Sequence, residues 1–300
     1  MEIKRNKQGA KMYDDDLPIV AICYDFDRTL SPREMQEYTI IPQFNISAPD
    51  FWKESNTFAT QNGMDKMLAS LYTVLAHASK NGVKISEADF TTLGSKVELF
   101  AGVETWFEHI NKVGEQVGVH IEHYIISAGI KEIIDGSKIS KHFEQIYASS
   151  FYYDTYGKPI WAKQVINAAS KTQYLFRVNK GCLDIRDEHS VHDYMQEDKR
   201  RIPFGNIIYI GDSETDIPTM KILTNQGGYS IGVYSDQNGL NTVSKLLLHK
   251  RVTHFAKADY RKGQELDTII TNIIKNIRAK ETLERITNAQ KKEAEKLKKK

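Results

Sequence analysis

The chain has 300 residues and a mass of 34.3 kDa, enough for one large domain with an insertion or for two modest domains. Hydrophobic residues make up 40% and charged residues 27% of it, close to ordinary globular usage, which argues against wholesale disorder or a fibrous repeat. The formal net charge is only +2, and much of the lysine surplus lies in the last ten residues, so nucleic acid is not an expected partner.

The first residues and the cysteine content indicate a cytoplasmic protein. Residues 1–16 are polar, and the apolar run Ile19–Tyr24 is too short for a signal or membrane segment. Cys23 and Cys182 are the only cysteines, too few for a disulfide framework or a thiolate metal cage, which suits a reducing compartment. We therefore expect no membrane association, and the sequence leaves the oligomeric state open.

Short apolar, β-branched runs, each followed by a helix-like stretch, are the strongest pattern in the chain. Continuous apolar strands that alternate with helices predict an α/β fold with a doubly wound parallel sheet covered on both faces. Ligands of such sheets bind beyond the carboxyl ends of the strands. The predicted strands are Ile19–Tyr24, Ile121–Ile126, Ile207–Ile210 and Tyr229–Val233, with a further one near Val252–Phe255.

A long segment between the first two strands, residues 31–99, has a helical pattern of its own. Helices are predicted over Met64–Lys80, where an apolar stripe recurs at helical spacing, and over Ser86–Phe100. The segment is therefore predicted to be an inserted helical cap domain on a catalytic core formed by residues 17–30 and 100–278. Its aromatic residues are candidates for a substrate pocket, although such a set more often forms a core: Phe44, Phe51, Trp52 and Phe58.

Two segments have no predicted role. The irregular region Phe151–Gly205 contains a polar stretch, residues 184–201, whose pattern predicts no structure. His189, His192 and Asp193 in that stretch are interpreted as solvated side chains and not as a second metal site. Residues 279–300 form a lysine-rich tail that is predicted to be a solvated helix.

Carboxylates follow two of the predicted strands. Asp25 and Asp27 end the first strand, and their spacing of two places both side chains on one side of an extended chain. Two carboxylates this close repel unless one takes a proton or a cation lies between them. Asp212 and Asp216 follow the strand Ile207–Ile210, at the same edge of the sheet. Acidic oxygens with no cysteine nearby favour Mg²⁺ as the bound ion.

A polar segment follows a third strand. Ile121–Ile126 is succeeded by Ser127, Ala128 and Gly129 and then by another predicted helix. A hydroxyl group together with free backbone N–H groups at a helix start is an anion site. The strand ends are thus predicted to bring together a nucleophile, a metal ion and an anion cradle. For Ser127 and Asp216 the simpler alternative is a helix-capping role.

Three motifs, in this order and spacing, resemble those of the haloacid dehalogenase (HAD) superfamily, and in particular its phosphoserine-phosphatase-like branch with a helical cap. They are the Asp-x-Asp-x-Thr motif from Asp25 to Thr29, Ser127 after a strand, and the Gly-Asp-x-x-x-Asp motif from Gly211 to Asp216. The resemblance covers residues 17–30 and 100–278, and residues 31–99 fall where this family places its cap.

The resemblance implies a phosphatase, a hydrolase of phosphoric monoesters, that acts on a small phosphorylated metabolite. Asp25 would attack phosphorus to form an aspartyl-phosphate, and Asp27 would act as general acid and then as general base. Mg²⁺ would be bound by the Asp25 carboxylate, the Asp27 backbone carbonyl and Asp212, with Asp216 binding directly or one shell further out. The residues expected to contact the substrate are Thr29, Ser127, Ala128 and Gly129.

The family pattern also includes a lysine, which offsets the negative charge of the phosphate and of Asp25. Three lysines that precede the last motif are candidates: Lys163, Lys171 and Lys180. Lys171 is favoured because it stands just before the apolar, helix-like run Tyr174–Phe176. Lys180 and Lys163 remain alternatives.

Two other functions are compatible with the same residues. A phosphomutase or phosphotransferase would pass the phosphoryl group to an alcohol, and a non-catalytic binding protein would keep the fold without turnover. A binding protein has no physical need to hold repelling carboxylates together. Hydrolysis is therefore the leading hypothesis.

Overall fold

The computed structural model describes residues 17–212 and 214–298. Seven strands form one sheet in the order β4-β3-β2-β1-β5-β6-β7, parallel except for β4, which pairs antiparallel with β3. The chain runs outward from β1 to β4 and then returns to β5 on the other side of β1, so the connection order reverses at β1, where such sheets bind ligands. The strands are β1 (Ile19–Tyr24), β2 (His120–Ile130), β3 (Gln145–Tyr153), β4 (Pro159–Gln164), β5 (Ile207–Gly211), β6 (Tyr229–Tyr234) and β7 (His254–Lys257).

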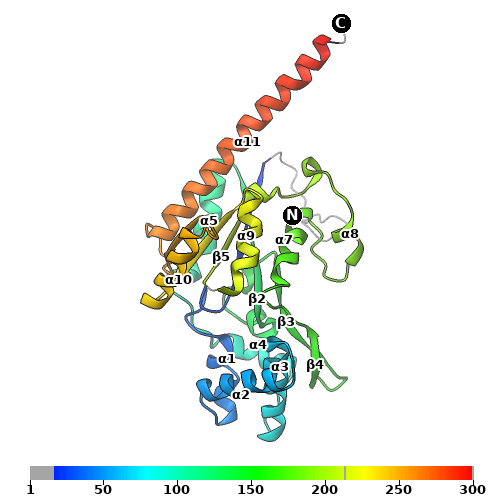
Figure 1. Ribbon diagram of the computed structural model, residues 1–300, viewed down its shortest axis with the longest axis vertical. Helices are drawn as coiled ribbons and strands as arrows, with labels where there is room; N and C mark the ends of the chain where they lie inside the picture. Colours follow the sequence, from blue (N-terminus) through cyan, green and yellow to red (C-terminus); the bar gives the residue numbers. More distant parts are fainter. Residues whose placement is uncertain (1–16, 213, 299–300) are drawn as a thin grey trace.

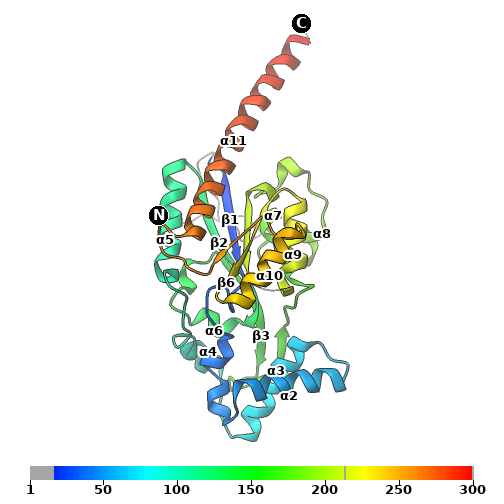
Figure 2. The same ribbon diagram turned by 60° about the vertical axis from the view of Figure 1, so that its left-hand side comes forward.

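Helices cover both faces of this sheet, which confirms the predicted doubly wound α/β fold (Figure 2). Side chains of β1 alternate between the faces, with Val20, Ile22 and Tyr24 on one side and Ala21 and Cys23 on the other, all buried. Helices α5 and α11 pack on the first side, and α7, α9 and α10 on the second. Their bounds are α5 (Val103–Val117), α7 (Lys171–Lys180), α9 (Ile217–Asn225), α10 (Gln237–Leu248) and α11 (Glu265–Lys298).

Residues 31–99 are mainly helical, and the three longer helices begin at side-chain caps provided by Ser47, Asp65 and Ser86. Helices α2 and α3 pack against each other beyond the carboxyl end of the sheet, whereas α4 packs on α6 (Figure 2). The contact with α6 is tight, because a Cβ at Gly136 would lie 1.7 Å from the Thr91 carbonyl oxygen. The elements are α1 (Met35–Tyr38), η1 (Ile41–Phe44), α2 (Ala48–Gln61), α3 (Lys66–Lys80), α4 (Glu87–Gly94) and α6 (Lys131–Asp135).

The structure differs from the predicted elements in three places. The sequence predicted neither α2 nor the hairpin of β3 and β4, which extends to α3. The predicted helix Ser86–Phe100 ends early, at Gly94, where a Cβ would lie 2.1 Å from the carbonyl oxygen of Ile133. The polar stretch 184–201 contains two short helices, and further short helices adjoin β3 and β5. These are α8 (Glu188–His192), η2 (Ser140–His142), η3 (Glu197–Lys199), η4 (Phe204–Asn206) and η5 (Glu214–Asp216).

Residues 279–298 of the lysine-rich tail belong to the second half of one continuous helix, α11, of 34 residues, and residues 299–300 lie outside the described residues. The first half packs on the sheet through a buried aliphatic stripe that includes Leu266, Ile270 and Ile274. Residues 282–298 are exposed, and this half projects away from the body of the molecule (Figure 1). Within the described ranges, none of the helices combines the length and apolarity needed to cross a bilayer.

Candidate active site

The chain turns sharply at the end of β1, and the turn brings two carboxylates together. Arg28 adopts a left-handed backbone conformation with φ 57°, uncommon outside glycine, and the backbone N–H of Leu30 returns to the carbonyl of Phe26 at 2.8 Å. Phe26 is fully buried, while Asp25 and Asp27 are 6% and 9% exposed. The two acidic residues thus lie at the same end of β1, with the intervening aromatic ring in the core.

Lys171, the first residue of α7, is the buried cation of the site. Its Nζ lies 2.7 Å from Asp25 Oδ2 and 2.7 Å from Asp216 Oδ1, and its side chain is 1% exposed. Burial lowers the pKa of Lys171, but the charges of Asp216 and Asp25 outweigh burial and hold this pKa above its ordinary value. The amine is therefore charged, and the Tyr209 hydroxyl supports the pair by donating to Asp216 Oδ1 at 2.7 Å.

The other two candidate lysines are placed differently. Nζ of Lys180 donates to the backbone carbonyls of Val191 and Asp193 at 2.7 and 2.6 Å, so this amine organises the polar stretch after α7. Lys163 is exposed on the edge strand β4. Of the three lysines, Lys171 is the one that the structure places against Asp25.

Three carboxylates at the ends of β1 and β5 form a group that can bind a cation. One oxygen from each of Asp25, Asp212 and Asp216 lies within 4.8 Å of the others. Burial, then the charges of Asp216 and Asp25, raise the pKa of Asp212 well above its usual range. Asp216 Oδ2 is buried and has no hydrogen-bond partner in the part of the chain that the structure describes. A buried, unpartnered oxygen beside two repelling carboxylates fits a hard divalent cation such as Mg²⁺.

A glycine makes room for this group. A Cβ at Gly211 would lie 2.4 Å from Asp216 Oδ2, so a side chain at the end of β5 would displace the carboxylate. Asp216 occupies the N-cap position of α9 but makes no side-chain capping hydrogen bond. The helix-cap alternative therefore does not explain its carboxylate.

The predicted solvated histidines are exposed. His189, His192 and Asp193 lie on or just after α8 at the surface. Within residues 17–212 and 214–298, the carboxylate group at the strand ends is the only set of three or more acidic, histidine or cysteine residues with ligand atoms this close together.

Burial sets the protonation of the two carboxyls after β1. It raises the pKa of Asp25 to about 6, with Lys171 lowering this pKa and Asp216 raising it. Burial, then the charges of Glu34 and Asp25, raise the pKa of Asp27 well above its usual range. At neutral pH Asp25 is therefore mainly a carboxylate, and the raised pKa of Asp27 favours its protonated form. The pair thus offers a nucleophile beside a proton donor.

The sequence predicted that Ser127 and Gly129 lie at the start of a helix. In the structure they lie near the irregular end of strand β2. Strand β2 continues to Ile130, and its pairing with β3 shifts register after Ile126. The N–H of Gly129 donates to Ser127 Oγ at 3.0 Å, and a Cβ at Gly129 would lie 3.1 Å from Asp27 Oδ2. The predicted helix does follow, as α6 from Lys131, but the strand extends four residues further than predicted, so the polar segment lies in β2 and not at the start of the helix. The segment still borders Asp27.

A cavity of about 380 Å³ adjoins the carboxylates. Asp27, Ala128 and Gly129 line it on the side of the sheet, and residues of α1, α2 and α3 line the opposite side. Thr29 is fully buried, and its carbonyl accepts a hydrogen bond from the Tyr260 hydroxyl at 2.8 Å. Thr29 therefore does not line this cavity, where the sequence predicted that it contacts the substrate.

The four candidate pocket aromatics separate into different roles. Trp52 lines the cavity beside Asp27, whereas Phe44 and Phe51 belong to the hydrophobic core. Phe58 stacks on Tyr72 at a ring distance of 4.8 Å. Of these four aromatic residues, Trp52 is therefore the one that lines the cavity beside Asp27.

Two neighbours of the carboxylates were absent from the predictions. The hydroxyl of Tyr209, in β5, contacts Asp216, and Glu34 lies close enough to raise the pKa of Asp27. Glu34 also pairs with Arg28 Nε at 3.1 Å. A tyrosine within an apolar strand and an acidic residue in a loop are common features, so the sequence held no specific signal for either.

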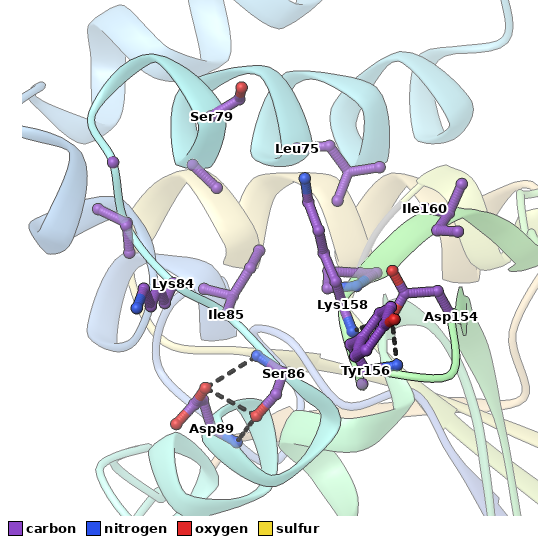
Figure 3. Close-up of a pocket in the computed structure, with 15 residues that line it drawn as sticks. Leu75, Ser79, Lys84, Ile85, Ser86, Asp89, Asp154, Tyr156, Lys158 and Ile160 are labelled. Carbon is purple, nitrogen blue, oxygen red and sulfur yellow. Dashed lines mark hydrogen bonds between the residues drawn. The ribbon is translucent and has the colours of Figure 1, made fainter.

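A larger cavity, of about 1000 Å³, lies elsewhere, between the C-terminal end of α3 and the turn that joins β3 to β4 (Figure 3). Its acidic residues are already engaged. Asp89 forms the capping box with Ser86, and Asp154 Oδ1 accepts the backbone N–H groups of Tyr156 and Lys158, both at 2.9 Å. None of the predicted site residues lines it, so cavity size does not locate the chemistry here.

No known family model matches the chain. A relative from Borreliella burgdorferi (strain ATCC 35210), named only as an uncharacterized protein, is 27% identical over 275 residues, which is 83% of this chain and 94% of the relative. This likeness covers most of both proteins and assigns no activity.

Solved structures with the same fold include hydrolases. A HAD family hydrolase from Salmonella enterica serovar Typhi superposes with a TM-score of 0.55 at 17% identity, covering 86% of this chain and 72% of that one. A probable phosphoserine phosphatase from Vibrio cholerae gives 0.55 at 12% identity, covering 89% and 69%. A phosphoserine phosphatase solved as a phospho-aspartyl intermediate analogue gives 0.50 at 14% identity, covering 85% and 99%. The fold is thus the HAD fold of the phosphoserine-phosphatase-like type, which confirms the resemblance seen in the sequence.

Proposed function

We propose that this chain, which has the fold of HAD hydrolases and phosphoserine phosphatases, is a Mg²⁺-dependent phosphatase that hydrolyses a small phosphomonoester through an aspartyl-phosphate on Asp25. The proposal rests on the contacts of Lys171 with Asp25 and Asp216, both 2.7 Å, beside the further carboxylate Asp212. A buried carboxylate held by a buried cation suits attack on an anionic phosphate. The names of the structural neighbours support the same class of reaction.

The proposed reaction has two steps. The Asp25 carboxylate bonds to phosphorus as the bond from phosphorus to the leaving oxygen breaks, and that oxygen takes the proton held by Asp27. Asp27 then accepts a proton from a water molecule whose oxygen attacks phosphorus, which releases phosphate and restores Asp25. The raised pKa of Asp27, caused first by burial, supports its role as the proton donor.

Mg²⁺ would be held by the carboxylates of Asp25, Asp212 and Asp216 and by the backbone carbonyl of Asp27. When bound, this ion supplies positive charge that stabilises the anionic phosphoryl group. The unpartnered oxygen of Asp216 and the raised pKa of Asp212 support a cation at this place. Lys171 remains charged and holds Asp25 in position for attack.

The substrate is proposed to be a small metabolite and not a protein or nucleic acid. The cavity beside Asp27 has a volume of about 380 Å³, which accommodates a compact organic phosphate. Residues 31–99 would serve as the cap that closes over it and excludes bulk water. A cytoplasmic location is supported by Cys23 and Cys182, both buried and unpaired.

Hydrolysis of a generic aryl phosphate in the presence of Mg²⁺ tests this function. We expect equal amounts of inorganic phosphate and phenol, with water as the acceptor. Transfer of the phosphoryl group to an added alcohol without release of phosphate would favour a phosphotransferase instead. No turnover of any phosphate ester would contradict the proposal.

Asp27→Asn is expected to lower kcat on an aryl phosphate by about 10²–10⁴-fold, the range for loss of a general acid and base. An amide cannot give a proton to the leaving oxygen or take one from water. A dinitrophenyl phosphate, whose leaving group needs no proton, should show a smaller loss in a pre-steady-state burst of phenol. A variant with the full steady-state rate would remove Asp27 from the mechanism.

The stabilisation of the protein by Mg²⁺ is expected to grow with pH. Burial raises the pKa of Asp25 from 3.8 to about 6 in the folded state, so without metal its contribution to stability falls as the pH rises through this window. Mg²⁺ binds only the deprotonated groups. Thermal unfolding in Mg²⁺ and in EDTA should therefore differ more at pH 7.5 than at pH 5.

Asp212→Asn provides the control for that measurement, because it removes one carboxylate of the group without touching Lys171. Its unfolding temperature should respond less to Mg²⁺ than that of the wild type. An equal response to Mg²⁺ at both pH values, or in both proteins, would show that the ion binds somewhere else.

A further inference from the structure

The cavity beside Asp27 contains polar groups that the protein itself does not satisfy. Gln36, Ser55 and Ser70 line it from α1, α2 and α3, and their exposed fractions are only 2%, 3% and 3%. Gln36 Oε1 is buried without a hydrogen-bond partner among residues 17–212 and 214–298. The Ser55 and Ser70 hydroxyl groups make no hydrogen bond within these residues and border the cavity. Helices α1, α2 and α3 thus each place one polar side chain without a protein partner at the same cavity.

Such groups are unusual because buried polar side chains are normally paired. The same helices show the normal behaviour a few residues away, where Thr39 Oγ1 donates to the Met35 carbonyl and Thr73 Oγ1 donates to the Ala69 carbonyl, both at 2.8 Å. Leaving a buried acceptor such as Gln36 Oε1 without a partner costs free energy. A ligand that hydrogen-bonds to these three side chains would supply the partners that the protein lacks.

The chemistry of the unpaired groups indicates a neutral ligand. A serine hydroxyl both donates and accepts, and a carboxamide does the same with separate atoms, so together they match hydroxyl groups. Among the charged lining residues other than Asp27, Arg28 and Glu34 pair with each other at 3.1 Å. Lys66 is exposed at the rim of the cavity, where solvent screens its charge.

We propose that Gln36, Ser55 and Ser70 bind the leaving group of the substrate and that this leaving group is a polyhydroxylated alcohol, so that the enzyme acts on sugar or polyol phosphates. This inference rests on the proposed phosphatase function and deepens it. Trp52, which lines the same cavity, offers an aromatic edge or face against which a sugar ring packs. The released alcohol keeps its carbon–oxygen bond and takes its proton from Asp27.

A substrate panel tests the assignment directly. Glycerol 3-phosphate, ribose 5-phosphate and glucose 6-phosphate are compared with O-phosphoserine, which carries an amine and a carboxylate in place of hydroxyl groups, and with an aryl phosphate. We expect the best sugar or polyol phosphate to exceed O-phosphoserine in kcat/KM by about 10-fold or more, since a site built for hydroxyl groups discriminates by its unpaired polar atoms. A preference for O-phosphoserine over every sugar and polyol phosphate would overturn the assignment.

Three variants assign the effect to residues: Ser55→Ala, Ser70→Ala and Gln36→Met. The measured quantity is the ratio of kcat/KM for the best sugar or polyol phosphate to kcat/KM for the aryl phosphate. Each variant should lower this ratio by about 5- to 30-fold, the effect of one lost hydrogen bond to substrate. Thr73→Ala is the matched control, because its hydroxyl is buried on α3 but already paired, and its ratio should equal that of the wild type.

Thermal stability separates a binding role from a structural one. Removal of a hydroxyl that has no partner should leave the unfolding temperature of Ser55→Ala and Ser70→Ala equal to the wild-type value or higher, whereas Thr73→Ala loses a hydrogen bond and should unfold at a lower temperature. If the ratio of kcat/KM values were unchanged in all three variants, the inference about the leaving group would be overturned. The proposed phosphatase function would still stand, provided that the aryl phosphate is hydrolysed. Failure to hydrolyse any ester would overturn both.

Discussion

Asp25→Asn is expected to abolish turnover of every phosphate ester, with a loss of about 10⁴-fold or more, as found when a nucleophile is removed from an enzyme. The amide has almost the size of the carboxylate and keeps an oxygen for the backbone N–H of Phe26, which donates to Asp25 Oδ1 at 2.7 Å. It lacks the anionic oxygen that would attack phosphorus. Steady-state release of phosphate measures the loss.

Rapid quenching of the wild type with a ³²P-labelled ester gives a second measurement. Label should remain on the protein in acid and be released by hydroxylamine, which cleaves acyl phosphates, and Asp25→Asn should carry none. Asp184→Asn is the control, because Asp184 is a surface residue paired with Arg186; it should retain full activity and labelling. Undiminished turnover by Asp25→Asn would exclude Asp25 as the nucleophile.

The parts of the fold that could be predicted are those in which local pattern and tertiary position coincide. The strand Ile19–Tyr24 has the predicted bounds, because a strand buried on both faces must be apolar throughout. The positions of Asp25 and Asp212 follow from the same logic, since the carboxyl ends of neighbouring parallel strands meet at one edge.

The parts that the sequence did not predict depend on tertiary contacts. Strand β4 begins with Pro159 and exposes Ile160 and Trp161 at 52% and 44%, so it lacks the apolar signal of the inner strands and forms only by pairing at an edge. The convergence of Gln36, Ser55 and Ser70 on one cavity is set by how three helices pack, and helical periodicity describes each helix separately.

The choice among the lysines shows the same limit. Lys171 is the first residue and Lys180 the last residue of the same helix, α7. The sequence pattern alone does not decide which of them lies at the active site. Their environments differ completely, because one amine is enclosed by carboxylates and the other by backbone carbonyls. A buried lysine with anionic partners is recognised only once the sheet brings those partners together.

Lys171→Met is expected to have two large effects that occur together. Removal of the amine leaves Asp25 and Asp216 buried, 6% and 0% exposed, without their cation, and breaking a buried ion pair in this way costs about 3–5 kcal/mol of folding free energy. Activity should fall by about 10²–10³-fold or more, because a preorganised positive charge beside the phosphate is lost. Chemical denaturation and phosphate release measure the two effects.

The pH dependence identifies the cause of the instability. Without Lys171, which lowers the pKa of Asp25, the folded-state pKa of this carboxyl rises further above its unfolded value, so the folded protein binds more protons than the unfolded chain and stability falls as the pH increases. The destabilisation should therefore be larger at pH 7.5 than at pH 5. Mg²⁺ should restore more stability to this variant than it adds to the wild type, because the ion replaces the missing positive charge.

Matched substitutions of the other two lysines complete the test. Lys163→Met and Lys180→Met should keep wild-type turnover, since Lys163 is exposed on β4 and the Lys180 amine contacts the carbonyls of Val191 and Asp193. Lys180→Met should lower the free energy of unfolding only modestly, because its amine holds the loop after α7. This loss should be the same at pH 5 and pH 7.5. If Lys180→Met were inactive and Lys171→Met active, the cation that balances Asp25 during phosphoryl transfer would have to come from the far end of α7, which would require that loop to open and the helix to move.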